Sequence, residues 1–176
     1  MLPLGADGFR GAVLLAPGRD VIDGTAEAYL ADLEAFLAEV STQHQCVAVV
    51  GSGGGRMIVT MDRYEADWTI VENGWKAHAE GSARPFTSAA EALATLRAED
   101  AGVSDQYLPP FTVVYAAGSP IGAMNDDDAV VIFNFRGDRM VEIYRALAED
   151  SLDAFPRGPL PKNLLVVGMT MYDGDL

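Results

Sequence analysis

The stretch VVIFNFRGDRMVEIY, residues 130–144, joins an apolar run to a helical pattern through a short turn that carries two arginines. The continuous apolar run over 129–135 is typical of a strand with both faces buried in a parallel sheet. The segment that follows, 138–149, is predicted to be helical. Arg136 and Arg139 therefore lie where a buried strand gives way to a helix.

The same alternation continues through the rest of the chain. The pattern predicts strands at 12–16, 46–51, 111–116 and 163–170, and helices at 25–40, 64–80 and 88–98. Alternating strands and helices indicate an α/β fold with right-handed crossovers. We expect a mostly parallel central sheet of about five strands, flanked by helices on both faces.

Length and charge restrict the classes of function. The 176 residues suit one domain spanning 1–176, and 26 acidic against 12 basic residues give a net charge of −14. This charge argues against general binding to nucleic acid or to an anionic membrane. No apolar run approaches the ~20 residues that cross a bilayer, and the N-terminal sequence does not resemble a signal peptide. With Cys46 as its single cysteine, the chain is expected to be cytoplasmic.

Five of the ten arginines follow three of the predicted strands. They are Arg19, Arg56, Arg63, Arg136 and Arg139. Ligands of α/β sheets gather beyond the carboxyl ends of the strands, and arginine binds carboxylate or phosphate through two parallel donors. The arrangement therefore predicts a site for a phosphorylated or carboxylated small molecule. Asp20, beside Arg19, is the best candidate for acid–base chemistry.

Each arginine has an alternative partner in a nearby carboxylate. The candidate pairs are Arg63 with Asp62 or Glu65, and Arg139 with Asp138 or Glu142. If all the arginines were paired in this way, the chain would be a scaffold or interaction domain that binds no small anion.

Other motifs indicate little chemistry. GSGGGR (51–56) matches neither a dinucleotide fingerprint nor a P-loop, so Gly53–Gly55 are expected to form a flexible loop that approaches the ligand. The acidic run at 126–128 is predicted to be a solvated turn, and His44 and His78 are predicted to lie at the surface. We find no complete metal site and no activated nucleophile.

Several of these segments together resemble the cofactor-independent (2,3-bisphosphoglycerate-independent) phosphoglycerate mutases. They are PGRDVIDGTAEAYLADLEAFL (17–37), GSGGGRMIVTMDRYEADWTIVENGW (51–75), DQYLPPF (105–111), DDDAVVIFNFRGDRM (126–140) and GMTMYDGDL (168–176). The resemblance implies an inserted α/β transferase domain, without the phosphatase-like domain that carries two divalent metal ions, typically manganese, and a serine nucleophile.

The resemblance also implies roles for the arginines in an enzyme that interconverts 3- and 2-phosphoglycerate through a phosphoserine. Arg19 and Asp20 would contact the glycerate, with Asp20 in proton transfer. Arg56 and Arg63 would grip the substrate, and Arg136 and Arg139 would bind its phosphate region. The chain departs from the family at Pro17, where an aspartate is usual, and it lacks the upstream segment with the family's catalytic histidine.

The resemblance therefore leads us to expect a substrate-binding domain whose partners are 2- or 3-phosphoglycerate and the phosphatase-like domain of the same enzyme. The isolated chain, with no cofactor of its own, is expected to be inactive. A non-catalytic binding module for phosphorylated small carboxylic acids is the alternative.

Overall fold

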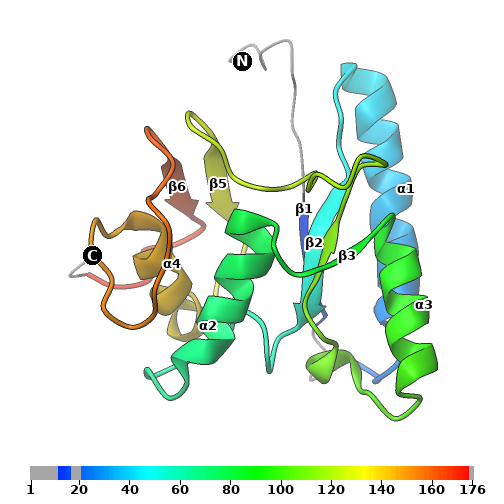
Figure 1. Ribbon diagram of the computed structural model, residues 1–176, viewed down its shortest axis with the longest axis horizontal. Coiled ribbons are helices and arrows are strands. Elements are labelled where there is room, and N and C mark those ends of the chain that lie inside the picture. Colours follow the sequence, from blue (N-terminus) through cyan, green and yellow to red (C-terminus); the bar gives the residue numbers. More distant parts are fainter. Residues whose placement is uncertain (1–11, 17–20, 175–176) are drawn as a thin grey trace.

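A computed structural model describes residues 12–16 and 21–174 of the chain (Figure 1). The strands are β1 (Ala12–Ala16), β2 (Val50–Gly55), β3 (Arg84–Phe86), β4 (Phe111–Val113), β5 (Ala129–Ile132) and β6 (Leu165–Gly168). The helices are α1 (Ala26–His44), α2 (Trp68–Gly74), α3 (Ala89–Glu99) and α4 (Val141–Ala148). Shorter turns are the π-helical η1 (Trp75–Glu80) and the 3-10 helices η2 (Asp105–Tyr107) and η3 (Gly137–Arg139).

The described strands form two sheets. A four-stranded sheet has the order β1-β2-β4-β3, in which β2 and β4 are antiparallel and the other two pairs are parallel. A second sheet contains only β5 and β6, which are parallel. The mixed α/β class is confirmed, whereas the expected central sheet of about five strands is not, because β5 and β6 pair with each other and not with the larger sheet.

Helices cover both faces of the four-stranded sheet (Figure 1). On one face α1 and α3 bury their leucines, among them Leu30 and Leu93, against Val50 and Phe111. The apolar residues of both helices recur every three or four positions, which places them on one side of each helix. On the opposite face η1 contacts β2 and β4. No helix in the described part of the chain is both long and apolar enough to cross a membrane.

A distant carboxylate fixes the start of α1. Asp105, which is 1% exposed, accepts hydrogen bonds from the backbone N–H groups of Gly24, Thr25 and Ala26 at 2.9, 3.0 and 3.2 Å. Gly24 and Thr25 directly precede the helix and Ala26 is its first residue, so these N–H donors have no partner within the helix. Arg97 of α3 also donates to Asp105, so this one side chain joins α1, α3 and η2.

The glycine run is a buried strand. β2 begins at Val50, later than predicted, and Gly53–Gly55 belong to it with all six residues of the strand buried. The prediction of a flexible loop is therefore wrong. A Cβ atom on Gly55 would lie 2.3 Å from the backbone oxygen of Gln106, so no larger residue fits beside η2. Close approach of two backbones, and not flexibility, explains glycine here.

One face of the β5–β6 sheet is uncovered. Its other face packs on α4 through Ile132, Val166 and Ile143. Exposed apolar residues continue from the uncovered face beyond both strands, and together we call them the apolar face: Val131, Leu165 and Val167 in the strands, and Phe133, Phe135, Met169 and Met171 in the segments that follow them. The prediction that both faces of this strand are buried is wrong, because an apolar run does not specify which neighbours cover it.

Candidate functional site

The loops after β2 and β5 meet at one end of the molecule. Both strands run in the same direction, so residues 56–63 and 136–139 emerge at the same end (Figure 1). Asn134 forms the turn after β5, because its side-chain oxygen accepts a hydrogen bond of 2.9 Å from the backbone N–H of Arg136. The 3-10 helix η3 then leads directly into α4.

Three arginines from these two loops converge, and we call Arg63, Arg136 and Arg139 the arginine cluster. Asp138 lies between two of them, with carboxylate oxygens 3.8 Å from Nη1 of Arg63 and 3.9 Å from Nε of Arg136. Arg139 donates from Nη1 to the backbone oxygen of Met61 at 2.5 Å. The Arg63–Asp138 ion pair and the Arg139–Met61 hydrogen bond thus join residues 61–63 to residues 136–139.

The two ion pairs to Asp138 are loose. Charged hydrogen bonds between arginine and carboxylate measure about 2.7–2.9 Å, well below the observed separations. The side chains of Arg63, Arg136 and Asp138 are 45%, 39% and 30% exposed, so solvent and small solutes reach them. Asp138 offsets part of the positive charge without making a close hydrogen bond to either guanidinium. The donors of Arg63 and Arg136 therefore stay available to an anion that binds beside Asp138 or displaces it.

Two buried acids lie near the cluster residues in the chain, Asp62 next to Arg63 and Glu142 three residues after Arg139. Asp62 accepts a hydrogen bond of 2.7 Å from the N–H of Asp67, and Glu142 accepts one of 3.0 Å from the N–H of Glu65. Burial raises the pKa of Glu142, and the negative charges of Asp62 and Glu65 raise it further. Glu142 Oε2 and Arg139 Nε are both buried without a hydrogen-bond partner in the described structure.

The other predicted site residues are placed differently. Arg56 donates from Nε and Nη2 to Oε1 of Gln106, at 3.1 and 2.7 Å, which ties it to η2. Arg19 and Asp20 lie outside the described residues. Of the six predicted residues, Arg63 and Arg136 are linked through Asp138, and Arg139 is tied to the same loop as Arg63 through the Met61 carbonyl. The alternative pairing of Arg63 with Asp62 or Glu65 is replaced by the contact with Asp138.

His78 is buried, and its predicted surface position is wrong. Its Nδ1 lies 2.8 Å from Oγ of Ser52, and its Nε2 lies 2.9 Å from Oγ1 of Thr60. Burial lowers its pKa to about 4, so the ring is neutral near pH 7. The sequence contained a signal for this position, since Val71, Trp75 and His78 follow the i, i+4, i+7 spacing of a buried helix face. His44 is exposed, as predicted.

The acidic run at 126–128 forms an exposed turn, as predicted. Asp128 accepts from the N–H of Asn125 at 2.6 Å, and Asp126 accepts from the N–H of Lys162 at 2.8 Å. These carboxylates therefore shape the turn. Across the described ranges, no group of three or more His, Cys, Asp or Glu side chains is arranged to hold a metal ion.

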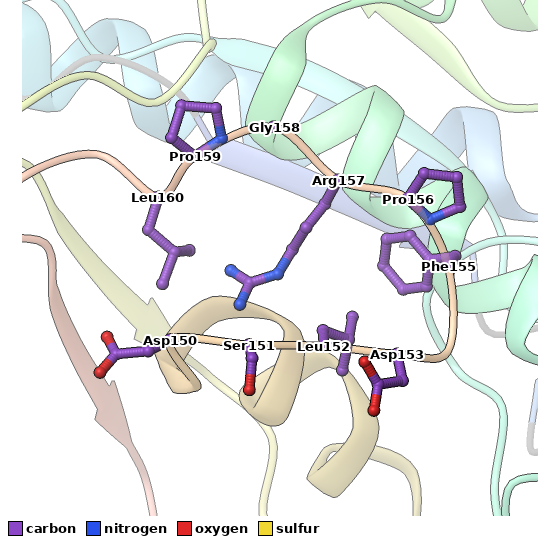
Figure 2. A pocket seen from close by; sticks show the side chains of 10 residues that line it. All are labelled: Asp150, Ser151, Leu152, Asp153, Phe155, Pro156, Arg157, Gly158, Pro159 and Leu160. Atoms are coloured by element: carbon purple, nitrogen blue, oxygen red, sulfur yellow. The ribbon is translucent and has the colours of Figure 1, made fainter.

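A hollow of about 350 Å³ lies within the loop 150–160 (Figure 2). Arg157 extends across it, donates a hydrogen bond to the backbone oxygen of Glu149 and lies 5.6 Å from the ring centre of Trp75. These contacts hold the loop against α4 and η1. The hollow contains none of the arginines of the cluster.

Comparisons with known proteins identify the family of the chain. A sequence model described as BPG-independent PGAM N-terminus matches residues 12–174. A 2,3-bisphosphoglycerate-independent phosphoglycerate mutase from Trypanosoma brucei brucei is 53% identical over 162 residues, which cover 92% of this chain and 29% of that protein. A probable mutase of the same name from Leptospira interrogans is 49% identical over 163 residues, with 93% and 29% covered.

A solved structure is similar in fold as well as in sequence. The phosphoglycerate mutase of Leishmania mexicana, determined at low cobalt concentration, superposes with a TM-score of 0.89 at 50% identity, and the match covers 93% of this chain and 29% of the other. The chain thus spans less than a third of the length of these relatives. It belongs to the family of the N-terminal part of the 2,3-bisphosphoglycerate-independent phosphoglycerate mutases.

Proposed function

We propose that this chain is the phosphoglycerate-binding part of a mutase that interconverts 3- and 2-phosphoglycerate. The observation that carries the proposal is the arginine cluster: in a chain of net charge −14, Arg63 and Arg136 from two loops share one carboxylate neighbour, and Arg139 is bonded to the Met61 carbonyl two residues before Arg63. Such a cluster is stabilised by an anion, and phosphoglycerate supplies both a phosphate and a carboxylate.

The residues of this chain would bind and orient the substrate. Arg63 and Arg136, which are partly exposed on either side of Asp138, would take up the negative oxygens of the ligand, while Arg139 stays fixed to the Met61 carbonyl. By the resemblance stated above, Arg19, Asp20 and Arg56 would complete the site, with Asp20 moving a proton at the glycerate hydroxyl. Positioning and charge stabilisation of this kind account for most of the catalysis of phosphoryl transfer.

The remaining chemistry would come from the rest of a full-length mutase. A phosphatase-like domain would supply the serine that carries the phosphoryl group and two divalent metal ions, expected to be manganese, which neutralise charge during transfer. This domain organisation, with residues 1–176 as one domain, fits the 29% of each relative that the chain covers. The cytoplasm stays the predicted location, and no binding to nucleic acid or membrane is expected.

The apolar face supports the participation of further protein. It leads directly into the arginine cluster, because Phe135 precedes Arg136 in the chain and is 74% exposed. Contiguous exposed apolar residues next to a polar site commonly mark an interaction surface. We therefore assign this face to contact with the remainder of the mutase chain.

Calorimetric titration with 3-phosphoglycerate tests the binding step. We expect the full 176-residue chain to bind it, and Arg136→Ala to weaken binding at least about tenfold, which corresponds to the ~1.4 kcal/mol of one charged hydrogen bond. Arg84→Ala is the matched control, since Arg84 pairs with Glu99 at 2.6 Å away from the cluster. Equal losses in the two variants would refute a specific site.

Turnover separates the proposal from its alternative. With 3-phosphoglycerate and manganese, the chain alone should form no 2-phosphoglycerate, and adding the remaining part of a related mutase should restore the reaction. Binding that persists without any turnover in the reconstituted mixture would instead support a non-catalytic module for phosphorylated acids. If no small anion binds at all, the scaffold alternative holds.

A further inference from the structure

Thr60 has a backbone conformation that its side chain disfavours. Its φ angle is +68°, in the left-handed region, where a β-branched residue is a genuine outlier. Such strain persists only where surrounding contacts fix it, and it is often found at functional sites. Thr60 directly precedes Met61, Asp62 and Arg63, the loop that reaches the arginine cluster.

The helix α2 approaches Thr60 more closely than a side chain would allow. A Cβ atom on Gly74 would lie 2.2 Å from Oγ1 and 2.8 Å from Cα of Thr60. Glycine within a helix costs about 1 kcal/mol relative to alanine, and the close approach explains why it occurs here. The backbone N–H of Thr60 also donates to the oxygen of Ile70 at 2.7 Å, so α2 holds both the backbone and the side chain of this residue in place.

His78 links Thr60 to the sheet. It lies on η1, one turn beyond Gly74, and its two ring nitrogens contact the hydroxyls of Thr60 and Ser52 at 2.9 and 2.8 Å. A neutral imidazole has one donor and one acceptor, which suits two hydroxyl groups. Ser52 belongs to β2 and is 2% exposed, so the bridge ends in the rigid core.

The conformation of Thr60 sets the direction of the loop that follows. The carbonyl of Met61 accepts the hydrogen bond from Arg139, Asp62 accepts from the N–H of Asp67, and Arg63 reaches Asp138. These three contacts start from consecutive residues, two of them to the neighbouring residues 138 and 139 and one to Asp67. A change of φ at Thr60 would redirect all three, because successive peptide planes turn only about φ and ψ.

We propose that His78 is a positioning residue: by bridging Ser52 and Thr60 it holds Thr60 in the left-handed conformation and thereby aligns Arg63 for anion binding and the Met61 carbonyl that fixes Arg139. His78 itself touches no ligand in this account. The role assigned to the two arginines rests on the proposed function, whereas the coupling of His78 to the loop is a property of the chain without ligand.

Three variants of the full chain test the proposal. His78→Leu removes both hydrogen bonds, His78→Gln keeps a donor and an acceptor, and Thr60→Val removes only the hydroxyl without a change of volume. We expect His78→Leu and Thr60→Val to weaken 3-phosphoglycerate binding at least about tenfold, since ångström-scale errors in position cost one to two orders of magnitude. His78→Gln should stay within about threefold of the wild type, and the Leu–Val double variant should be no weaker than the weaker single variant.

The control for general loss of stability is Thr112→Val. Thr112 is 1% exposed in β4 and its hydroxyl donates to the oxygen of Ala77 at 3.5 Å, so the substitution perturbs the same core and removes none of the hydrogen bonds described above for residues 60–63. Titrations are made where urea curves show every variant folded. Equal weakening by Thr112→Val and His78→Leu would overturn the proposal, as would additive losses in the double variant.

A measurement without ligand separates this proposal from the proposed function. A positive φ brings the amide and α protons of the same residue close together, which gives a strong NOE for Thr60 in the wild type. We expect this NOE to persist in His78→Gln and Thr112→Val and to weaken in His78→Leu and Thr60→Val. If the wild type binds no 3-phosphoglycerate, the proposed function fails, and the NOE alone decides: an unchanged NOE in both Leu and Val variants would refute the positioning role.

Discussion

Lowering the pH from 7 to 5 should destabilise this protein through a single buried histidine. His78 is neutral in the folded chain because burial lowers its pKa to about 4, from an ordinary value of 6.5. In the unfolded chain the ring is solvated and takes up a proton near the ordinary value. Below pH 6.5 the unfolded state therefore binds more protons than the folded state, and stability falls with pH.

The size of the effect follows from the two pKa values. They differ by about 2.5 pH units, and each unit corresponds to about 1.4 kcal/mol, so the full loss is about 3 kcal/mol. The contribution is complete above pH 6.5, is lost as pH falls towards 4, and changes no further below that. At pH 5 about 2 kcal/mol should already be lost, a large share of the ~5–15 kcal/mol that stabilises a typical domain.

Urea unfolding of the wild type and of His78→Gln at a series of pH values isolates this effect. Other groups contribute to both proteins, including Glu142, whose raised pKa acts in the opposite direction. We therefore expect the difference in unfolding free energy between the two proteins to shift by about 2 kcal/mol between pH 7 and 5. His44→Gln, which removes the other histidine from an exposed site on α1, should follow the wild type. A constant difference between wild type and His78→Gln would refute the reasoning.

Three further substitutions test the packing. Gly55→Ala would place Cβ 2.3 Å from the backbone oxygen of Gln106, so we expect a loss of at least about 3 kcal/mol in urea unfolding; a loss near that of an exposed Gly→Ala change would contradict the buried strand. Asp105→Asn replaces the carboxylate that accepts from the first turn of α1 and from Arg97, and should cost about 2–3 kcal/mol, with helix loss visible by circular dichroism if α1 frays. Phe133→Ser, at a site 84% exposed on the apolar face, should change stability by less than about 0.5 kcal/mol while reducing the binding of a hydrophobic dye. An unaltered dye signal would show that the apolar face is not the dye's binding surface.

The helices were predictable from the sequence because their signal is local. The apolar spacing at 25–40 and 88–98 identifies α1 and α3 to within a few residues at each end. Strand pairing is not local. The run at 129–135 has the same apolar composition whether both its faces are buried or one is open, and nothing in it specifies that β5 pairs only with β6. The glycines of β2 carry no side chain that would signal burial in the sequence. The burial of Gly55 follows from the backbone of η2, which packs against it.

The candidate site was predictable only in part, for a similar reason. Arg136 and Arg139 share one turn, so their proximity follows from sequence spacing, and the meeting of this turn with Arg63 follows from both loops lying at strand ends. The attachment of Arg56 to Gln106 was not foreseeable, because a neutral amide 50 residues away gives no charge signal. Identifying the partners of His78 requires knowledge of where Ser52 and Thr60 lie in space.

The charge of Asp62 and Glu142, the buried acids near the arginine cluster, affects how strongly the cluster attracts an anion. Each additional negative charge near the arginines would weaken the attraction of the cluster for an anionic ligand. Burial and the neighbouring charges raise the pKa of Glu142, so its ionisation costs more free energy in the folded chain than in the unfolded chain. A raised folded pKa in an acid gives stability that is present below the ordinary pKa and is lost as pH rises through the folded value.

Glu142→Gln should therefore raise the free energy of unfolding more at pH 7 than at pH 4. The amide keeps an oxygen that accepts from the N–H of Glu65, and it carries no charge to bury. The same substitution should leave 3-phosphoglycerate binding unchanged or strengthen it, since glutamine cannot carry the negative charge that would oppose an anionic ligand. Glu99→Gln, which neutralises an exposed acid paired with Arg84, is the matched control for a change in net charge alone. A clear loss of binding in Glu142→Gln, with Glu99→Gln unaffected, would mean that the ionised carboxylate of Glu142 holds the cluster together and that our account of its charge is wrong.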